Sequence, residues 1–454
     1  MSRESESIFD GITRISDEVI EETHTSAVKK PVPFRTKRQR LYTLSAAAAA
    51  VVLFLSFILS RGTLRAYAIE EAKYPKEARY TSDDVSMKHF LEVSVPAMLS
   101  GAGDKNIVCS PVNVYLSLSA LAELTDGNTR QEMLSVLDSG SMEEQRSKAN
   151  LLWNNLYVND KRGKTLLASS VWLDKDIRYN EDTMKVLSGN YYASSYRGKM
   201  GSNALNRAMG QWISKNTGGK LDNTDGGTNP DTVLALISTV YFKANWDSKF
   251  SASDNYTGTF HESSADVPVT FMKQTLKQST CIWGDRFMAV SQHFETNQTM
   301  YYILPDEGYT PEDLLNDPEF QSLISGSLSE GSLKDQCKPM KVHLSVPKFD
   351  ISSEINLKAG FEKMGIHDVL DDNRADFTPM TDLPGIALEE ATNNVRVTIN
   401  EKGCEAVSYV KFLNGATSAA PIDDEMDFIL DRPFIFMITN VSGNPLFLGI
   451  VNQP

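Results

Sequence analysis

The chain has 454 residues, of which 41% are apolar and 23% charged, and this composition excludes a disordered or fibrous protein. Its 45 basic and 59 acidic side chains give a net charge of −14, which opposes non-specific attraction to nucleic acid, so no nucleic-acid partner is expected. The 4 cysteines have no C-x-x-C spacing, and the 6 histidines never pair at metal-ligand spacing. No G-x-S-x-G, H-E-x-x-H, Walker or G-x-G-x-x-G motif occurs. We therefore expect neither an enzyme nor a metal or cofactor site.

An apolar segment without any charge covers residues 41–60, and it is long enough to cross a hydrocarbon core of about 30 Å as a single transmembrane helix. Basic residues are more frequent before it than after it, so the positive-inside rule places residues 1–40 in the cytoplasm as a tail. This tail weakly resembles the juxtamembrane tails of some bacterial membrane-anchored proteins. The expected protein is a single-pass cell-membrane protein, with a juxtamembrane linker at 61–79 and one domain at 80–454 outside.

Two other interpretations of the apolar segment are less favoured. Ala66 and Ala68 have the small-x-small form of a signal-peptide cleavage site, and cleavage after Ala68 would give a secreted protein. The segment is longer than a signal core, however, and a long tail precedes it. A buried soluble helix is disfavoured because the segment offers no polar face.

Helical patterns dominate the first half of the outer part. Ser110 and Pro111 supply an N-cap and a proline at the first helical position, and apolar residues then recur at helical spacing as far as 126–127. Thr129 and Glu132 have the spacing of a capping box, which predicts a second helix start. A third helix is predicted over 204–215.

Strand patterns dominate the second half. Apolar and polar residues alternate in three segments, and three others are continuously apolar, as in strands buried on both faces. These segments are 267–271, 342–346, 395–399, 233–242, 434–438 and 446–451. Helices gathered before strands predict an α+β domain with large, mainly antiparallel sheets.

Nine short motifs follow one another along this domain: Asn106–Asn113, Trp212–Leu221, Thr239–Trp246, Ile303–Asp306, Val346–Phe349, Ala375–Phe377, Glu401–Ala406, Arg432–Phe436 and Leu448–Val451. In kind and order they resemble the serpins, a family of serine protease inhibitors. The resemblance implies a monomer with three β-sheets, eight to nine helices and an exposed reactive loop. It also implies that a protease cuts this loop, which then inserts as an extra strand into the central sheet.

The expected reactive loop is 401–427. Successive side chains of an inserting strand must point alternately to the core and to solvent. In this loop, one set of alternate residues is suited to burial, and the other set contains both charged residues. The core-facing set is Cys404, Ala406, Ser408, Val410 and Phe412, and the outward set is Glu405, Val407, Tyr409, Lys411 and Leu413. No proline interrupts 401–420, so every backbone N–H there can join a ladder. The predicted hinge comprises Glu401, Gly403, Cys404, Glu405, Ala406, Ser408 and Val410.

Two features of the loop leave alternatives open. Inhibitory hinges of the family are rich in very small residues, and Val407, Tyr409 and Val410 depart from that pattern. The alternative function is a non-inhibitory serpin-fold ectodomain that acts as a binding or cleavage-sensing module. Cys404 is unusual in a hinge, and a small buried residue is a simpler interpretation than a redox switch.

Family geometry places the reactive bond between Thr417 and Ser418 when it is counted from Glu401. Counting back from Pro433 points later, so the bond is assigned to the range Ala416 to Ile422. The residues from 416 to 420 are all small, which favours serine proteases with a shallow primary pocket, of elastase-like or subtilisin-like type. Serine proteases that prefer small residues are therefore the expected partners.

The resemblance also assigns a region that controls opening of the central sheet. It comprises Ser110, Asn113, Ser238 and Asn393. The family pattern would have serine at 113, asparagine at 238 and histidine at 393, so this chain has an altered polar network there.

Overall fold

The computed structural model describes residues 64–65, 67–74, 85–159, 163–219, 227–326, 333, 336–404 and 424–454. The chain divides into two units, Met1–Arg61 and Gly62–Pro454, and all described residues belong to the second. The predicted membrane span at 41–60 lies outside the described residues. Within the described ranges, no helix is both long and apolar enough to cross a membrane.

The described residues contain nine α-helices, in agreement with the expected eight to nine. They are α3 (Lys88–Leu99), α4 (Pro111–Glu123), α5 (Gly127–Val136), α6 (Met142–Leu156), α7 (Glu181–Asn190), α8 (Asn203–Asn216), α9 (Pro311–Leu314), α10 (Pro318–Ile324) and α11 (Leu357–Lys363). Two short 3₁₀ helices cover Ala252–Asp254 and Asp368–Leu370.

Sheet A has eight strands and contains the site described below. Its order is β1 (Ala68–Glu70), β5 (Ala193–Gly198), β4 (Gly163–Asp174), β6 (Leu234–Asn245), β14 (Gly403–Cys404), β13 (Glu390–Asn400) and β12 (Phe349–Asn356), with β3 (Val158–Asn159) paired to β4. The pairs β4–β5 and β6–β13 are parallel, and the other pairs of sheet A are antiparallel. The edge strand β1 comes from the segment that the sequence predicted to be a linker.

Sheet B has nine strands. Its order is β15 (Glu425–Ile429), β11 (Cys337–Pro347), β8 (Asp266–Trp283), β9 (Phe287–His293), β10 (Thr299–Pro305), β16 (Phe434–Thr439), β17 (Pro445–Val451) and β2 (Ile107–Cys109), with β7 (Tyr256–His261) paired to β8. The sequence predicted three sheets, whereas the described residues form two. The reason is that β8, which is 18 residues long, pairs with β7 at one end and with β9 at the other, so strands expected in two sheets share one ladder.

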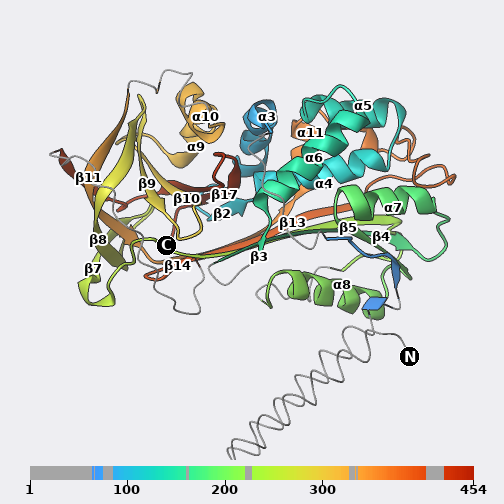
Figure 1. Cartoon of the computed structure of the whole chain (residues 1–454), viewed down its shortest axis with the longest axis horizontal. Helices are drawn as coiled ribbons and strands as arrows, with labels where there is room; N and C mark the ends of the chain where they lie inside the picture. Colours follow the sequence, from blue (N-terminus) through green and yellow to red (C-terminus); the bar gives the residue numbers. More distant parts are fainter. Residues whose placement is uncertain are drawn as a thin grey trace, which may run out of the picture. The chain divides into compact units, whose positions relative to one another are not determined.

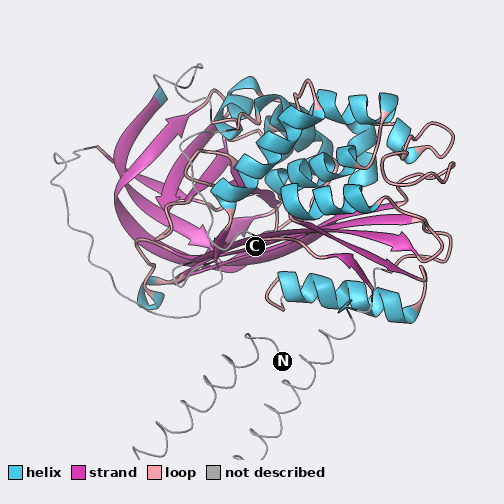
Figure 2. Cartoon of the chain, turned by 45° about the vertical axis from the view of Figure 1, so that its right-hand side comes forward, coloured by secondary structure: helices cyan, strands magenta, loops and turns pink. Residues whose placement is uncertain are grey.

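Helices cover the two faces of sheet A unequally (Figures 1 and 2). Most of them lie on the face that shares the main hydrophobic core with sheet B. Among the helices whose bounds are given above, α8 lies on the opposite face, where a second cluster joins Trp212 and Ile213 of α8 to Trp172 of β4 and Ile237 of β6. The seam between β6 and β13 therefore runs beside α8.

Several local predictions are confirmed and one is wrong. Helix α4 begins as expected, with Pro111 at its first position and the Ser110 side chain accepting a hydrogen bond from the Asn113 N–H. The predicted third helix corresponds to α8. The predicted capping box of Thr129 and Glu132 does not form, because α5 already begins at Gly127.

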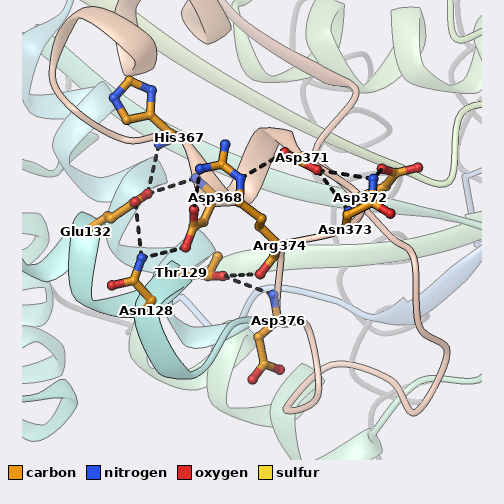
Figure 3. Close-up of polar contacts among 10 residues, drawn as sticks. All are labelled: Asn128, Thr129, Glu132, His367, Asp368, Asp371, Asp372, Asn373, Arg374 and Asp376. Carbon is orange, nitrogen blue, oxygen red and sulfur yellow. Dashed lines mark hydrogen bonds and ion pairs between the residues drawn. The ribbon is translucent and has the colours of Figure 1, made fainter.

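The side chains of Thr129 and Glu132 instead bind the segment that follows α11 (Figure 3). The Glu132 carboxylate accepts from the N–H groups of His367 and Asp368, at 2.8 and 2.9 Å, and the Thr129 hydroxyl accepts from the Asp376 N–H at 3.0 Å. Thr129 and Glu132 have the spacing of a capping box, but their side chains bind the backbone of another segment and not the N-terminal N–H groups of their own helix.

Candidate functional site: the opening of sheet A

The two-residue strand β14 lies between β6 and β13 at one end of sheet A. Gly403 is opposite Asn245 of β6 and Asn400 of β13, and Cys404 is opposite Ala244 and Ile399. β14 is antiparallel to both neighbours. The first residues of the predicted reactive loop have therefore already entered the sheet, over the two residues of β14.

Beyond β14, β6 and β13 pair directly with each other along a parallel seam. The seam joins Ala235–Thr239 of β6 to Glu390–Asn394 of β13. Sheet A is thus closed along the seam and opened by β14 at its end. A strand that extended β14 would have to separate the seam pairs one after another.

Cys404 lies on the core side of the sheet. Its side chain is 2% exposed, and its register partners Ala244 and Ile399 are each 1% exposed. Directly opposed residues in a sheet share a face, so the three side chains are buried together. None of the four cysteines, which all lie in the described residues, forms a disulfide bond.

Gly403 permits this entry because it has no side chain. Its φ is +148°, a region that residues with a Cβ rarely adopt, and a Cβ at this position would lie 2.1 Å from the Ala244 carbonyl oxygen. Any other residue would force β14 away from β6.

Glu401 is held at the mouth of the sheet by two side chains from other elements. Its Oε1 atom lies 2.5 Å from Lys348 Nζ, and the same oxygen accepts a hydrogen bond of 2.7 Å from Asn255 Nδ2. The backbone is fixed as well, because the Phe250 N–H donates to the Glu401 carbonyl at 3.1 Å. We call Glu401, Lys348 and Asn255 the hinge clamp.

The hinge clamp changes the acidity of Glu401. Partial burial acts to raise the pKa of this carboxyl, but the hydrogen bonds from Lys348 and Asn255 outweigh it and hold the pKa below its ordinary value. The carboxylate therefore stays ionised, and the clamp stays formed, at neutral pH.

Trp246 fixes the chain on either side of Glu401. Its indole N–H donates to the Asn400 carbonyl at 3.0 Å, and its backbone N–H donates to the Lys402 carbonyl at the same distance. The residues from 400 to 404 thus form an anchored turn from β13 into β14.

The four residues predicted to control sheet opening do meet at the seam. Ser238 and Asn393 are register partners, the Ser110 N–H donates to Asn393 Oδ1 at 3.3 Å, and Ser110 also caps Asn113. All four are at most 1% exposed. Within the described residues, both amide atoms of Asn113, the Ser238 hydroxyl and Asn393 Nδ2 have no hydrogen-bond partner.

The described residues offer these four buried atoms no protein partner. A buried polar group that lacks a partner costs about 1–3 kcal/mol of stability. The seam is therefore closed at a position where several buried polar atoms are poorly satisfied by the protein.

The other end of the predicted loop is bound to sheet B. β15 pairs in parallel with β11, and Lys338 and Lys341 form ion pairs with Asp424 and Glu425 at 2.9 and 2.6 Å. The structure describes the chain up to Cys404 and again from Asp424. The predicted reactive bond at Thr417 and Ser418, with its range Ala416 to Ile422, lies outside the described residues, as do the hinge positions Glu405, Ala406, Ser408 and Val410.

Sequence reasoning missed several members of the site. Trp246 and Lys348 stand inside two of the family motifs, so a signal for them was present although no role was assigned. Asn255 had no such signal, because its contact with Glu401 joins residues far apart in the chain.

A sequence model of the serpin (serine protease inhibitor) family matches residues 87–454, and the chain belongs to this family. It is 27% identical over 372 residues to an uncharacterized serpin-like protein from Thermococcus kodakarensis, covering 77% of this chain and 81% of that protein. It is 26% identical over 364 residues to the leukocyte elastase inhibitor of Sus scrofa, covering 77% and 93%. The crystal structure of tengpin, a thermophilic serpin in its native state, matches with a TM-score of 0.73 at 21% identity and covers 86% of this chain and 100% of tengpin. Serpins are generally protease inhibitors rather than enzymes.

Proposed function

We propose that this chain inhibits serine proteases as a suicide substrate. The serine hydroxyl of the protease forms an ester with the carbonyl carbon at the cut, the C–N bond breaks, and the new amine leaves with a proton. The N-terminal part of the cut loop then inserts between β6 and β13 and carries the acylated protease with it before water hydrolyses the ester. The observation that carries this proposal is β14, which already pairs with both strands in the antiparallel sense that insertion requires.

The register of β14 supports insertion of the residues that follow it. Continuing the two ladders brings each core-facing loop residue between side chains that are at most 6% exposed. The expected contacts are Ala406 with Phe242 and Val397, Ser408 with Val240 and Val395, and Val410 with Ser238 and Asn393. The predicted core-facing set includes Cys404, which is buried. An inserted strand would extend as far as Ser238 and Asn393, the seam residues opposite Val410.

The energetics favour the inserted form. β6 and β13 have 12 and 11 residues, so a full strand between them adds about ten ladder hydrogen bonds, each worth roughly 0.5–1.5 kcal/mol. Their sum, on the order of 10 kcal/mol, is comparable with the stability of an ordinary domain. The uncut fold is accordingly a kinetically trapped state, as expected of a strain-release device.

The loop sequence favours proteases with a small primary pocket. Residues 416–420 are all small, and neither Arg nor Lys occurs between Asn414 and Met426. We therefore assign the target to the elastase-like or subtilisin-like serine proteases.

The test is a gel. Incubation with pancreatic elastase should give a covalent complex that survives SDS, while trypsin, as a control, should give none through this bond. Cleavage of the loop by elastase and subtilisin without any complex would refute inhibition and favour the non-inhibitory module.

We also propose that residues 41–60 anchor the protein in the cell membrane with the serpin domain outside. Cleavage after Ala68 is disfavoured because Ala68 is the first residue of β1, so the cut would fall inside a strand of sheet A. N-terminal sequencing of the cell-associated protein tests this. A mature protein that begins at Ile69 would refute the anchor.

A further inference from the structure

A pocket of about 420 Å³ lies at one end of sheet B, where five segments of the chain meet. Its walls come from the turn after α3, the end of β7 with the turn that follows, the start of α9, the segment between β15 and β16, and the end of β17. The volume falls within the range of roughly 300–1,000 Å³ that is typical of small-molecule sites. The pocket shares no residue with the opening of sheet A, so a ligand there goes beyond the proposed function.

Hydrogen bonds between these segments hold the walls of the pocket in place. The Gly101 N–H donates to Glu312 Oε1 at 2.8 Å, and the Ser263 hydroxyl donates to Asp104 Oδ1 at 2.5 Å. Asn452 Nδ2 donates to two carbonyl oxygens of the turn after α3, at 3.0 and 2.8 Å. The pocket is therefore formed before a ligand arrives, which lowers the cost of binding one.

Much of the wall is apolar. Its apolar residues are Ala102, Tyr309, Pro311, Pro433 and Ile450. The Tyr309 side chain is 42% exposed, so part of this large apolar ring is open to a ligand. Because removal of apolar surface from water is favourable, the pocket is suited to a ligand with an apolar body.

The basic side chains that line the pocket already have acidic partners. Arg432 Nη1 lies 3.2 Å from Asp431 Oδ1, and His261 Nδ1 lies 2.7 Å from Asp266 Oδ1. The guanidinium and the imidazole are thus each compensated by a carboxylate of the protein.

The acidic side chains that line the pocket lack such partners. Asp104 and Glu312 are exposed, each accepts the hydrogen bond from an uncharged group given above, and within the described residues neither forms an ion pair. Arg286, whose guanidinium carbon lies 5.3 Å from the centre of the Tyr309 ring, pairs with Asp317 at 3.8 Å instead. The uncompensated charge of the pocket is therefore negative, and it favours a cation.

We propose that this pocket binds a primary ammonium group carried on a short apolar body. The three N–H donors of an ammonium group suit the oxygens of Asp104 and Glu312 that the wall hydrogen bonds leave free. The apolar body packs against Tyr309 and Pro433. A small organic amine and a lysine side chain of a peptide both present this chemistry, and the experiment distinguishes them.

The experiment is a calorimetric titration of the full-length protein in detergent micelles, with empty micelles as the blank. The three probes share one body and differ in their head group: phenethylamine, 2-phenylethanol and 3-phenylpropionate. Phenethylamine should bind with a Kd of about 1 mM or below, about tenfold more tightly than the neutral alcohol, and the carboxylate should bind most weakly.

The double variant Asp104→Asn with Glu312→Gln removes both charges but keeps an amide oxygen for each wall hydrogen bond. It should bind phenethylamine about tenfold more weakly than the wild type. The matched control is Glu92→Gln with Glu143→Gln, which removes two exposed carboxylates of α3 and α6 outside the pocket and should leave the affinity unchanged.

Equal affinity for the three probes, or an unchanged affinity for phenethylamine in the Asp104→Asn, Glu312→Gln variant, would overturn the proposal. Absence of phenethylamine binding up to about 10 mM would also overturn it. Ala102→Trp fills the pocket and should abolish binding, and unchanged binding by this variant would place the amine elsewhere. Thermal melts verify the fold of each variant.

A competition arm identifies the source of the ammonium group. An acetylated and amidated tripeptide with a central lysine has no free amine other than the lysine side chain. If it displaces phenethylamine at equal concentration, the ligand is a lysine of a protein partner, and if it does not, the ligand is a small amine. The elastase gel reports separately on inhibition, so failure of the amine site and failure of the proposed function are distinguishable.

Discussion

A single charge in the core-facing set should convert the inhibitor into a substrate, whereas the same charge one residue later should not. The register places residue 406 between Phe242 and Val397, which are 6% and 1% exposed, so Ala406→Glu would bury an unpaired carboxylate. The effective penalty for such a charge is several kcal/mol. If about 3 kcal/mol of it is felt as the strand enters, insertion slows roughly a hundredfold.

The matched control is Val407→Glu. The same register places residue 407 between Tyr241 and the exposed Arg396, on the outward side of the sheet, where a carboxylate would remain hydrated. We expect elastase to cut both variants equally fast, because neither change is at the predicted reactive bond. The ratio of covalent complex to cleaved product, measured on gels, should fall at least tenfold for Ala406→Glu and stay near the wild-type ratio for Val407→Glu. Equal trapping by the two variants would refute the insertion register.

The remaining predictions concern the hinge clamp, the seam and the reactive bond. Because the pKa of Glu401 is lowered in the folded protein, the hinge clamp stabilises the fold above the ordinary glutamate pKa, and this stabilisation is lost as the pH falls through the lowered value. Thermal melts of the wild type should show this loss of stability in acid. The same acid-dependent loss in Glu401→Gln would contradict the assignment. Ser238→Ala removes a buried hydroxyl without a described partner, so it should raise the melting temperature of the uncut protein by about 1 °C, equivalent to about 1 kcal/mol. A lower melting temperature would show that the hydroxyl is satisfied. Thr417→Arg should shift complex formation from elastase towards trypsin, and an unchanged preference would mean that the reactive bond lies elsewhere.

Much of the fold could be predicted because its signals are local. The Ser110–Pro111 start of α4 and the apolar face of α8 are encoded within a few residues. The merger of two expected sheets could not be predicted, since it depends on how far β8 continues as one strand. The edge strand β1 was also missed, because its three residues gain their structure from pairing with β5.

The site was predictable in part, for the same reason. Gly403 and Cys404 stand in a recognisable motif, and the structure places them between β6 and β13. The partners of Glu401 come from distant segments, so spacing along the chain gave no indication that Asn255 would donate to it. The unsatisfied atoms of Asn113 and Ser238 likewise depend on how the helices pack against sheet A.

The most direct test compares the melting temperature of the intact protein with that of the protein nicked in its loop by a catalytic amount of subtilisin. The strand that begins at β14 should complete sheet A after nicking, so the nicked form should melt roughly 10–15 °C higher, as a gain on the order of 10 kcal/mol implies for a domain of this size. A nicked form that melts at or below the temperature of the intact form would contradict the proposed mechanism.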